Sequence, residues 1–470
     1  MKLHQGWPKA TPLFDDDNLV SCGGLVPVME LAEQAGLSEL LADRVSIKSS
    51  LVASAGANPA GKVASIIAGM TAGADSIDDL DIVRSGGMKQ VFDHVYAPAT
   101  LGQFLRSFTH GHVAQLASVA RAHLVNLTER TDLLAGIEHQ AFIDIDSLLR
   151  PVYGHAKQGA SYGHAKIAGR SLLRKGLSPL VTTISTPTSA PAVAGTRLRA
   201  GKAGSGKAAA SMVTEAIRTT RACGATGKIL LRGDSAFGTS KVVNACIDAG
   251  VEFSVVLAQN NAVAAAISRI GDDAWQSVHY PGAVLDPDNG NLISDAEVAE
   301  IPYTAFARNN PVTARLIVRR VRDRAKDQEL FPVWRHHPFF TNSTEPVTVA
   351  DITHRRHAIV ETVFADLIDG PFAHMPSGRF AANHAWAICA SMAYNLLRAT
   401  DSLAPRTHSD MPVPACGSTL RRQIINVPAR LARPQRRPVM HLPAHWPWAE
   451  RWLRIWDRVF ATATGPPVTV

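Results

Sequence analysis

The chain has 470 residues, of which 46% are hydrophobic and 19% are charged, so it carries enough apolar side chains for folded domains and is neither disordered nor fibrous. Its 48 Lys and Arg against 40 Asp and Glu give a net charge of +8. Five scattered cysteines without a CxxC pair argue against a disulfide framework and against a structural zinc site. Because the N-terminal residues lack the apolar run of a secretion signal, we expect a cytoplasmic protein.

The first third of the sequence is expected to be helical. Apolar residues recur at helical spacing in 25–45, 60–71 and 100–127. The period changes at Ala141, where a run of eight residues alternates and places Asp144 and Asp146 on one face of a strand. Further strands are predicted at 180–185, 228–231, 251–257 and 314–321, with helices at 207–223 and 239–249 between them. This order indicates an α/β region.

The remainder of the chain mixes turns, helices and a basic tail. Turn-forming residues are frequent in 281–308, and helices are predicted at 349–368 and 380–399. The last of these contains Asn383, His384 and Asn395, which favours a buried core helix over a membrane span. The tail 402–443 is rich in Pro and Arg. The tryptophans after it are expected to dock an amphipathic helix on the core, the alternative being stacking on bases; they are Trp446, Trp448, Trp452 and Trp456.

Positive charge is concentrated in three segments. Positions 166–232 hold twelve Lys and Arg against Glu215 alone, and positions 308–326 hold six Arg and one Lys against Asp323. From position 401 onward there are ten Arg and four acids. Because Lys and Arg placed on phosphates release condensed counterions, these excesses favour a nucleic-acid partner over a basic surface without function.

Three acidic positions stand out from their surroundings. Asp146, with Asp144 beside it, lies in an apolar strand; Asp234 follows another apolar strand and precedes a turn; Glu361 lies on an apolar helix behind a basic turn. Two strand acids and one helix acid that converge would coordinate Mg²⁺ or Mn²⁺, because hard cations prefer oxygen ligands. Two such ions about 4 Å apart can activate a water or a 3′-hydroxyl for phosphodiester transfer.

Each of these acids also has a purely structural interpretation. An acid that follows a strand is often a turn or capping residue, which is the alternative for Asp234. A Glu beside arginines is often a surface ion pair, which is the alternative for Glu361. For Asp144 and Asp146 both interpretations stay open, because like charges on one strand face repel unless a cation or solvent compensates.

Two further motifs carry little weight. Gly201-Lys-Ala-Gly-Ser-Gly-Lys-Ala matches a phosphate-binding loop except at Ala208, which replaces the Ser or Thr that would hold Mg²⁺, so we expect a basic loop near DNA phosphates. The histidines at 336, 337, 354 and 357 lack thiolate partners, so a zinc site is not expected.

At the three acids the sequence resembles bacterial insertion-sequence transposases of the IS1380 group, within the broader IS4-like DDE transposases. The matching blocks are 142–164, which begins Phe-Ile-Asp-Ile-Asp-Ser-Leu-Leu-Arg-Pro, 230–235, which reads Leu-Leu-Arg-Gly-Asp-Ser, and 361–370, which reads Glu-Thr-Val-Phe-Ala-Asp-Leu-Ile-Asp-Gly. A further block is 100–112, Thr-Leu-Gly-Gln-Phe-Leu-Arg-Ser-Phe-Thr-His-Gly-His. The resemblance covers about residues 15 to 400.

The resemblance implies an α/β fold with an RNase H-like catalytic core, a β-rich insertion and a preceding helical DNA-binding region. The expected boundaries are 1–135 for the helical region, 136–400 for the core with its insertion at about 260–345, and 401–470 for a basic tail. Carried over residue by residue, the catalytic carboxylates that bind two Mg²⁺ or Mn²⁺ ions are Asp146, Asp234 and Glu361. Expected DNA contacts, chosen for their position along the chain, are Lys166, Arg170, Lys207, Arg232, Arg355 and Arg356.

The implied activity is cleavage and strand transfer of double-stranded DNA at terminal inverted repeats, by a homodimer associated with the bacterial nucleoid and without a membrane. The signature around the Glu departs from the IS4-like pattern, since His354, His357 and Ile368 replace a Tyr, an Arg and a Lys. Arg355 and Arg356 are candidates to supply the missing cation. Two alternatives stay open: a nuclease on the same core without strand transfer, and a catalytically inactive DNA-binding protein derived from a transposase.

Overall fold

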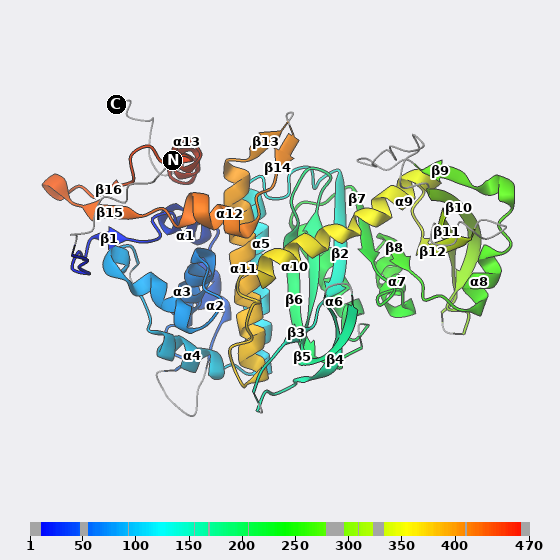
Figure 1. Cartoon of the computed structure of the whole chain (residues 1–470), viewed down its shortest axis with the longest axis horizontal. Coiled ribbons are helices and arrows are strands. Elements are labelled where there is room, and N and C mark those ends of the chain that lie inside the picture. The colour runs from blue at the N-terminus through cyan, green and yellow to red at the C-terminus, as the bar shows by residue number, and fades with distance from the viewer. Residues whose placement is uncertain are drawn as a thin grey trace.

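The computed structural model describes residues 11–47, 55–92, 94–154, 156–167, 170–204, 206–278, 296–308, 310–322, 333–408 and 411–461, without the side chains of 165–171 and 407–413. Figure 1 shows helices of the N-terminal third on one side of a long central helix and a large sheet on the other. In the described part of the chain, no helix is both long enough and apolar enough to span a bilayer.

The N-terminal third forms helices where the apolar spacing predicts them. They are α1 (Leu25–Gln34), α2 (Leu37–Arg44), α3 (Pro59–Ala72), α4 (Pro98–Arg106) and α5 (His110–Arg130), with short 3-10 turns η1 (Asp78–Arg84) and η2 (Gly86–Gln90). The Asn58 side chain accepts a hydrogen bond from the Gly61 N–H and caps α3, while Thr109 and His112 form a capping box at α5. Local capping and spacing therefore account for these helix boundaries.

The central sheet has the strand order β3-β5-β2-β7-β8-β12-β11-β10-β9, and β4 and β6 also pair with β5. β2, β7 and β8 are parallel neighbours, whereas the other pairs are antiparallel. The strands are β2 (Gln140–Ser147), β3 (Arg150–Pro151), β4 (Ser161–Ile167), β5 (Arg170–Ser185), β6 (Ala192–Ala200), β7 (Lys228–Gly233), β8 (Glu252–Val256), β9 (Gln276–Val278), β10 (Ala296–Ala305), β11 (Val312–Arg322) and β12 (Trp334–Thr341).

Helices cover both faces of the sheet. α6 (Ala209–Ala222) lies on one face, where Glu215 pairs with Arg197 of β6, and α7 (Ser240–Asp248) packs beside it. The opposite face carries α9 (Val347–Arg355), the 3-10 turn η5 (Arg356–Ile359), α10 (Val360–Ile368) and α11 (Phe380–Leu403). α11 packs on β6 and also on α3 and α5, so it is buried nearly all round, as its apolar sequence predicts.

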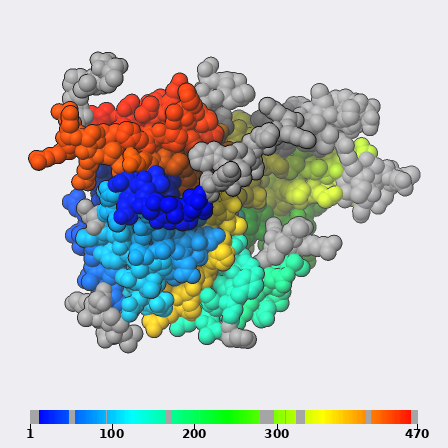
Figure 2. Space-filling model, turned by 60° about the vertical axis from the view of Figure 1, so that its left-hand side comes forward, coloured from blue at the N-terminus to red at the C-terminus, as the bar shows by residue number. Residues whose placement is uncertain are grey.

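The C-terminal segment returns to the N-terminal helices, as Figure 2 shows. β1 (Leu19–Val20) pairs with β15 (Ala429–Ala432), and β15 also pairs with β16 (Val439–His441). The buried Trp452 of α13 (Ala449–Phe460) donates to the Ile424 carbonyl, so the expected docking of an amphipathic helix is confirmed. The remaining elements are α8 (Asn261–Ile267), η3 (Asp272–Ala274), β13 (Arg406–His408), β14 (Met411–Val413), α12 (Gly417–Leu420), the π turn η6 (Arg421–Ile425) and η7 (Pro434–Arg436).

One segment differs from its sequence prediction. The turn-rich stretch 281–308 lies partly outside the described residues, but its described end, 296–305, is the strand β10 rather than a loop. Ala296, Val298 and Ala299 of this strand are buried, and β10 pairs along its length with β11. The apolar residues near its start therefore outweigh the turn-forming residues that precede them.

Candidate active site

Asp146 and Asp234 lie at the carboxyl ends of two neighbouring parallel strands. The β2–β7 register ends with Asp144 opposite Arg232 and Ile145 opposite Gly233, so Asp146 and Asp234 are the next residues on each strand. Parallel strands lie about 4.8 Å apart. The two acids, predicted from segments 88 residues apart in sequence, therefore reach the same edge of the sheet, where α/β proteins bind their ligands.

The face on which Asp146 lies follows from the strand registers. Val181 of β5 is directly opposite Asp146 of β2 and Thr196 of β6, so the three residues share one face of the sheet. The Thr196 hydroxyl lies 2.6 Å from the Ser391 hydroxyl of α11. Asp146 therefore belongs to the face that α10 and α11 cover.

Asp234 is exposed and also shapes its own turn. Its carboxylate accepts a hydrogen bond from the Ala236 N–H at 2.9 Å, and its carbonyl accepts one from Phe237. Asp234 is therefore a turn residue, as the structural interpretation predicts. The turn uses one carboxylate oxygen, and the second oxygen could still bind a cation.

Asp144, the acid two residues before Asp146, has a different role. The Arg232 guanidinium donates to both Asp144 oxygens at 2.7 Å and to the Thr353 carbonyl at 3.0 Å, and it lies 4.3 Å from the Phe142 ring centre. Both members of this ion pair are only 1% exposed. Burial raises the pKa of Asp144, and the adjacent guanidinium opposes that rise. The pair joins β2, β7 and α9 from inside the core.

The prediction that Arg232 contacts DNA is corrected by this geometry. A side chain that is 1% exposed and bound to three oxygens has no surface to offer a phosphate. The sequence signal that could have revealed the pair is the position of Arg232 inside an apolar strand, because a buried cation needs a buried anion.

Glu361 lies in the first turn of α10 and is exposed. α10 contacts β2, and Val360, Val363, Phe364 and Leu367 form its buried side. Among the described residues Glu361 takes part in no ion pair, so its interpretation as a partner of nearby arginines is not supported. The helix thus carries an acid above the sheet face that holds Asp146.

The segment before Glu361 is anchored by a buried histidine. The His354 ring stacks on Phe339 with 4.2 Å between ring centres, and its Nδ1 lies 2.8 Å from the Ser254 hydroxyl. Burial lowers the pKa of His354 to about 3, and the nearby His357 and Arg232 side chains lower it further. His357 donates from its own Nδ1 to the His354 carbonyl at 2.7 Å. These histidines therefore hold α9 and η5 on β8 and β12.

Acid should destabilise the fold through buried histidines. Burial lowers the pKa of His354 to about 3 and those of His123 and His384 to about 4, below the ordinary value of 6.5. Since the unfolded chain binds more protons in this window, the free energy of unfolding is expected to fall as the pH drops below 6.5. Each histidine contributes at most about 1.4 kcal/mol per pH unit. Urea unfolding of His354→Gln between about pH 5 and about pH 7 should show a shallower slope.

The exposed His441 provides the control for this prediction. His441→Gln, which removes an exposed imidazole, is measured under the same conditions, so that a change of slope can be assigned to the buried position. A slope in His354→Gln equal to that of the wild type would show that His354 is protonated in the folded state.

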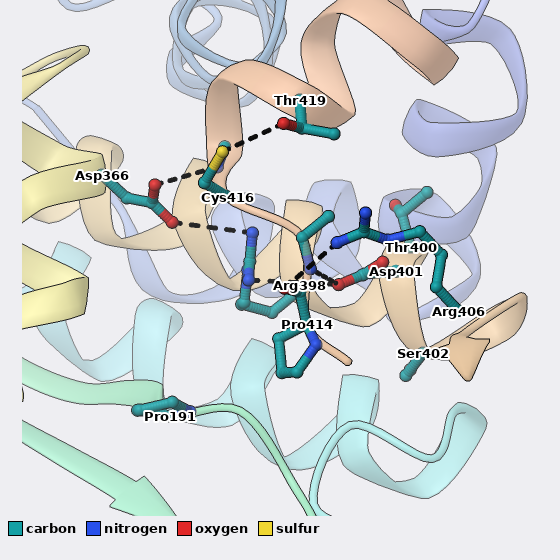
Figure 3. Close-up of polar contacts among 12 residues, drawn as sticks. Pro191, Asp366, Arg398, Thr400, Asp401, Ser402, Arg406, Pro414, Cys416 and Thr419 are labelled. Atoms are coloured by element: carbon teal, nitrogen blue, oxygen red, sulfur yellow. Dashed lines mark hydrogen bonds and ion pairs between the residues drawn. The ribbon is translucent and has the colours of Figure 1, made fainter. Parts of the chain in front are cut away.

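The far end of α10 is held by a network of charged side chains, shown in Figure 3. Asp366 of α10 accepts from the Gly417 N–H at 2.9 Å and lies 3.6 Å from the Arg398 guanidinium of α11. Asp401, one turn further along α11, pairs with Arg451 of α13. The network ties the helix of Glu361 to α11 and to the C-terminal segment.

A basic loop and a buried arginine lie beside Asp146. Arg199 of β6 donates to the Ser178 carbonyl and to the carbonyls of Gly204 and Lys207, which belong to the loop before α6. Burial lowers the pKa of Arg199 to about 10, and the Asp146 carboxylate opposes this shift. Arg199 was not identified as a candidate in the sequence analysis. Its hydrogen bonds hold the loop 201–208, whose sequence resembles a phosphate-binding motif.

The other predicted DNA contacts lie in three parts of the fold: the loop before α6, the end of α9 with η5, and the β4–β5 hairpin. Lys207, Arg355 and Arg356 are exposed. The backbones of Lys166 and Arg170 pair with each other's neighbours in the β4–β5 hairpin, and their side chains lie outside the described part of the structure.

Two of the basic clusters are partly neutralised inside the fold. Arg315 pairs with Glu300 and Arg320 with Glu297, each across the β10–β11 hairpin. Arg320 also stacks between the rings of Trp275 and Trp334. In the tail, Arg451 is buried with Asp401. Counting arginines along the chain therefore overstates the charge that these two segments offer to DNA.

The three acids do not form a closed set of ligands. Across the described ranges, no group of three or more His, Cys, Asp and Glu side chains is arranged to hold a metal ion. What the fold brings together is the strand-end pair Asp146 and Asp234, with Glu361 on the helix that packs on β2. Oxygen donors of this kind suit a hard divalent cation.

A mixed α/β fold with acids at adjoining parallel strand ends and a basic loop beside them defines a candidate phosphodiester-processing enzyme. The family model described as transposase DDE domain group 1 matches residues 8–464. The chain therefore belongs to this family of DDE transposases. Such transposases act on DNA as nucleases and transesterases and generally use divalent metal ions. No curated protein matches the sequence.

Proposed function

We propose that this chain is an IS1380-like transposase that binds the terminal inverted repeats of an insertion sequence and moves it by a cut-and-paste mechanism. The observation that carries the proposal is the β2–β7 register, which brings Asp146 and Asp234 to the same edge of the sheet. Glu361, on the helix that packs on β2, is the third member of the proposed catalytic set.

The proposed architecture follows the family pattern. Strands β5, β2, β7 and β8 with α6, α7 and α10 would be the RNase H-like core within 136–400. The antiparallel strands β9 to β12 would form the insertion at about 260–345 between the second acid and Glu361. Helices α1 to α5, within 1–135, would bind DNA, and residues 401–470 would be a basic tail rich in Pro, Arg and Trp.

In the proposed mechanism, Asp146, Asp234 and Glu361 would hold two Mg²⁺ or Mn²⁺ ions, because carboxylate oxygens are the donors that hard cations prefer. When bound, the metals would activate a water or a 3′-hydroxyl and stabilise the leaving oxygen. The protein's own contribution is positional. The Asp144–Arg232 pair fixes the two strand ends relative to α9, and the Asp366–Arg398 pair fixes α10 relative to α11.

The proposed function is tested by incubating purified protein and Mg²⁺ with DNA that carries the two ends of an insertion sequence. Cleavage at the ends followed by joining to a second DNA would support it. Cleavage without joining of precleaved ends would instead identify a nuclease. Metal-independent binding without cleavage of any end would identify an inactive DNA-binding protein. The particle mass in the DNA complex would test the proposed homodimer.

A further inference from the structure

The two strands of the β4–β5 hairpin continue beyond the central sheet as a ribbon. β3 and β6 pair with β5 only as far as Gly176 and Leu177, whereas β4 pairs with β5 from Gly176 to Arg170. Residues 161–167 and 170–176, here named the β4–β5 ribbon, therefore extend with no third strand beside them among the strands that the structure describes (lower centre of Figure 1). Two isolated strands of this kind are only marginally stable in water without a partner surface.

One face of the ribbon combines rings, apolar groups and positive charge. Tyr162 is opposite Lys175 and His164 is opposite Leu173, so these four side chains share a face. Tyr162 is 64% exposed and Leu173 is 56% exposed. Tyr153, which follows β3 at the base of the ribbon, is 84% exposed. Soluble proteins rarely leave such a set uncovered unless it binds something.

The charge around the ribbon identifies the kind of partner. Between Asp146 and Glu215 the sequence contains ten Lys and Arg and not one Asp or Glu. Arg197 is neutralised by Glu215 and Arg199 is buried, but Arg174, Lys202 and Lys207 are exposed. A segment that offers exposed rings and cations and itself contains no acid complements a polyanion with flat bases, which is a nucleic acid.

The base of the ribbon is rigid and joined to the basic loop. A Cβ on Gly201 would lie 2.2 Å from the Ser161 carbonyl oxygen and 2.4 Å from that of Gly176, so only glycine fits there. The Lys202 N–H donates to the Ser161 hydroxyl at 2.8 Å. The loop that resembles a phosphate-binding motif is thus built onto the ribbon, and it carries Lys202 and Lys207 beside it.

The ribbon continues the strand β5, which also pairs with the strand of Asp146. On β5, Val181 is opposite Asp146 and Lys175 is opposite Tyr162, six residues apart, which spans about 20 Å along a strand. We propose, building on the proposed transposase function, that the ribbon binds unpaired nucleotides next to the reacting phosphate. The Tyr162 ring stacks on a base, and Lys175, Lys202 and Lys207 contact the backbone. Unpaired bases fit better than a duplex, whose bases are already stacked on each other.

The proposal is tested by fluorescence anisotropy on the full chain in EDTA, with a labelled strand of about twenty thymidines and a labelled random duplex of the same length. Tyr162→Ala is expected to weaken binding of the single strand about tenfold and to change duplex binding less than about twofold. Tyr162→Phe should bind like the wild type, because the ring is kept. Phe14→Ala, which removes a ring that is even more exposed and lies far from the ribbon in sequence, is the control.

Several outcomes would overturn the proposal. The proposed base stacking on the ribbon would be excluded if Tyr162→Ala bound the single strand as tightly as the wild type does. It would also be excluded if Tyr162→Ala lost affinity equally for the single strand and the duplex. A shift in sedimentation of Tyr162→Ala towards monomer, with DNA binding unchanged, would instead identify the face as a contact between two copies of the chain. Because the assay needs no metal, it is independent of catalysis: cleavage by the wild type with normal strand binding by Tyr162→Ala would refute the ribbon role alone.

Discussion

Replacing Asp146 with Asn should reduce cleavage of insertion-sequence ends at least about a thousandfold while leaving DNA binding intact. The proposed metals depend on carboxylate charge, and losing several kcal/mol of transition-state stabilisation corresponds to that factor. The same result is expected for Asp234→Asn and Glu361→Gln. Binding should be equal or slightly tighter, since each change removes a negative charge near phosphates. Cleavage is measured on end-labelled DNA with Mg²⁺, and binding is measured on the same DNA without metal.

Two comparisons make this prediction specific. Asp248→Asn changes an exposed carboxylate at the end of α7, away from the strand ends, and should cleave normally. The melting temperatures of the three site variants should match the wild type, because Asp146, Asp234 and Glu361 are all at least partly exposed. Retained cleavage in any one of them would exclude that residue from the catalytic set.

Asp144→Asn should act on stability instead. The change leaves the Arg232 guanidinium buried without its anion, and breaking a buried ion pair on one side costs about 3–5 kcal/mol. The urea midpoint should therefore fall sharply, whereas Asp146→Asn, only two residues away, should leave it unchanged. Arg232→Met should be destabilised as well, because it leaves a buried carboxylate without its partner.

The double variant Asp144→Leu, Arg232→Met separates the charge pair from simple packing. Replacing both members by apolar side chains of similar size removes both buried charges together, so it should be less destabilised than either single variant. If Asp144→Asn were as stable as the wild type, the ion pair would not contribute to the fold. If the double variant were the least stable of the set, packing rather than charge would explain the effect.

The predicted helices and strands correspond closely to the fold wherever the spacing of apolar residues determines the secondary structure. The alternation at 141–148 is found as β2, and the apolar runs at 228–231 and 251–257 are found as β7 and β8. Residues 380–399 lie within α11, buried between two layers as expected. Periodicity works here because each stretch packs one face, or all faces, against the core. It did not detect β4, β6 or β12, although β4 and β6 pair with β5 and β12 pairs with β11, their neighbours in the sequence.

Residue order alone predicts an acid on one strand, an acid just after a second strand and an acid on a helix. It also gives the excess of cations along the segments between them. Composition and alternation are local properties, so they can be seen in the sequence. Only the tertiary structure separates Asp144 from Asp146, because both occupy the same face of one strand and differ in what lies opposite them. It also turns Arg232 from a proposed DNA contact into the partner of a buried acid, pairs Arg315 and Arg320 within a hairpin, and joins β1 to β15. Such pairings depend on residues that are far apart along the chain, and spacing in sequence carries no information about which distant charge will neutralise a given side chain.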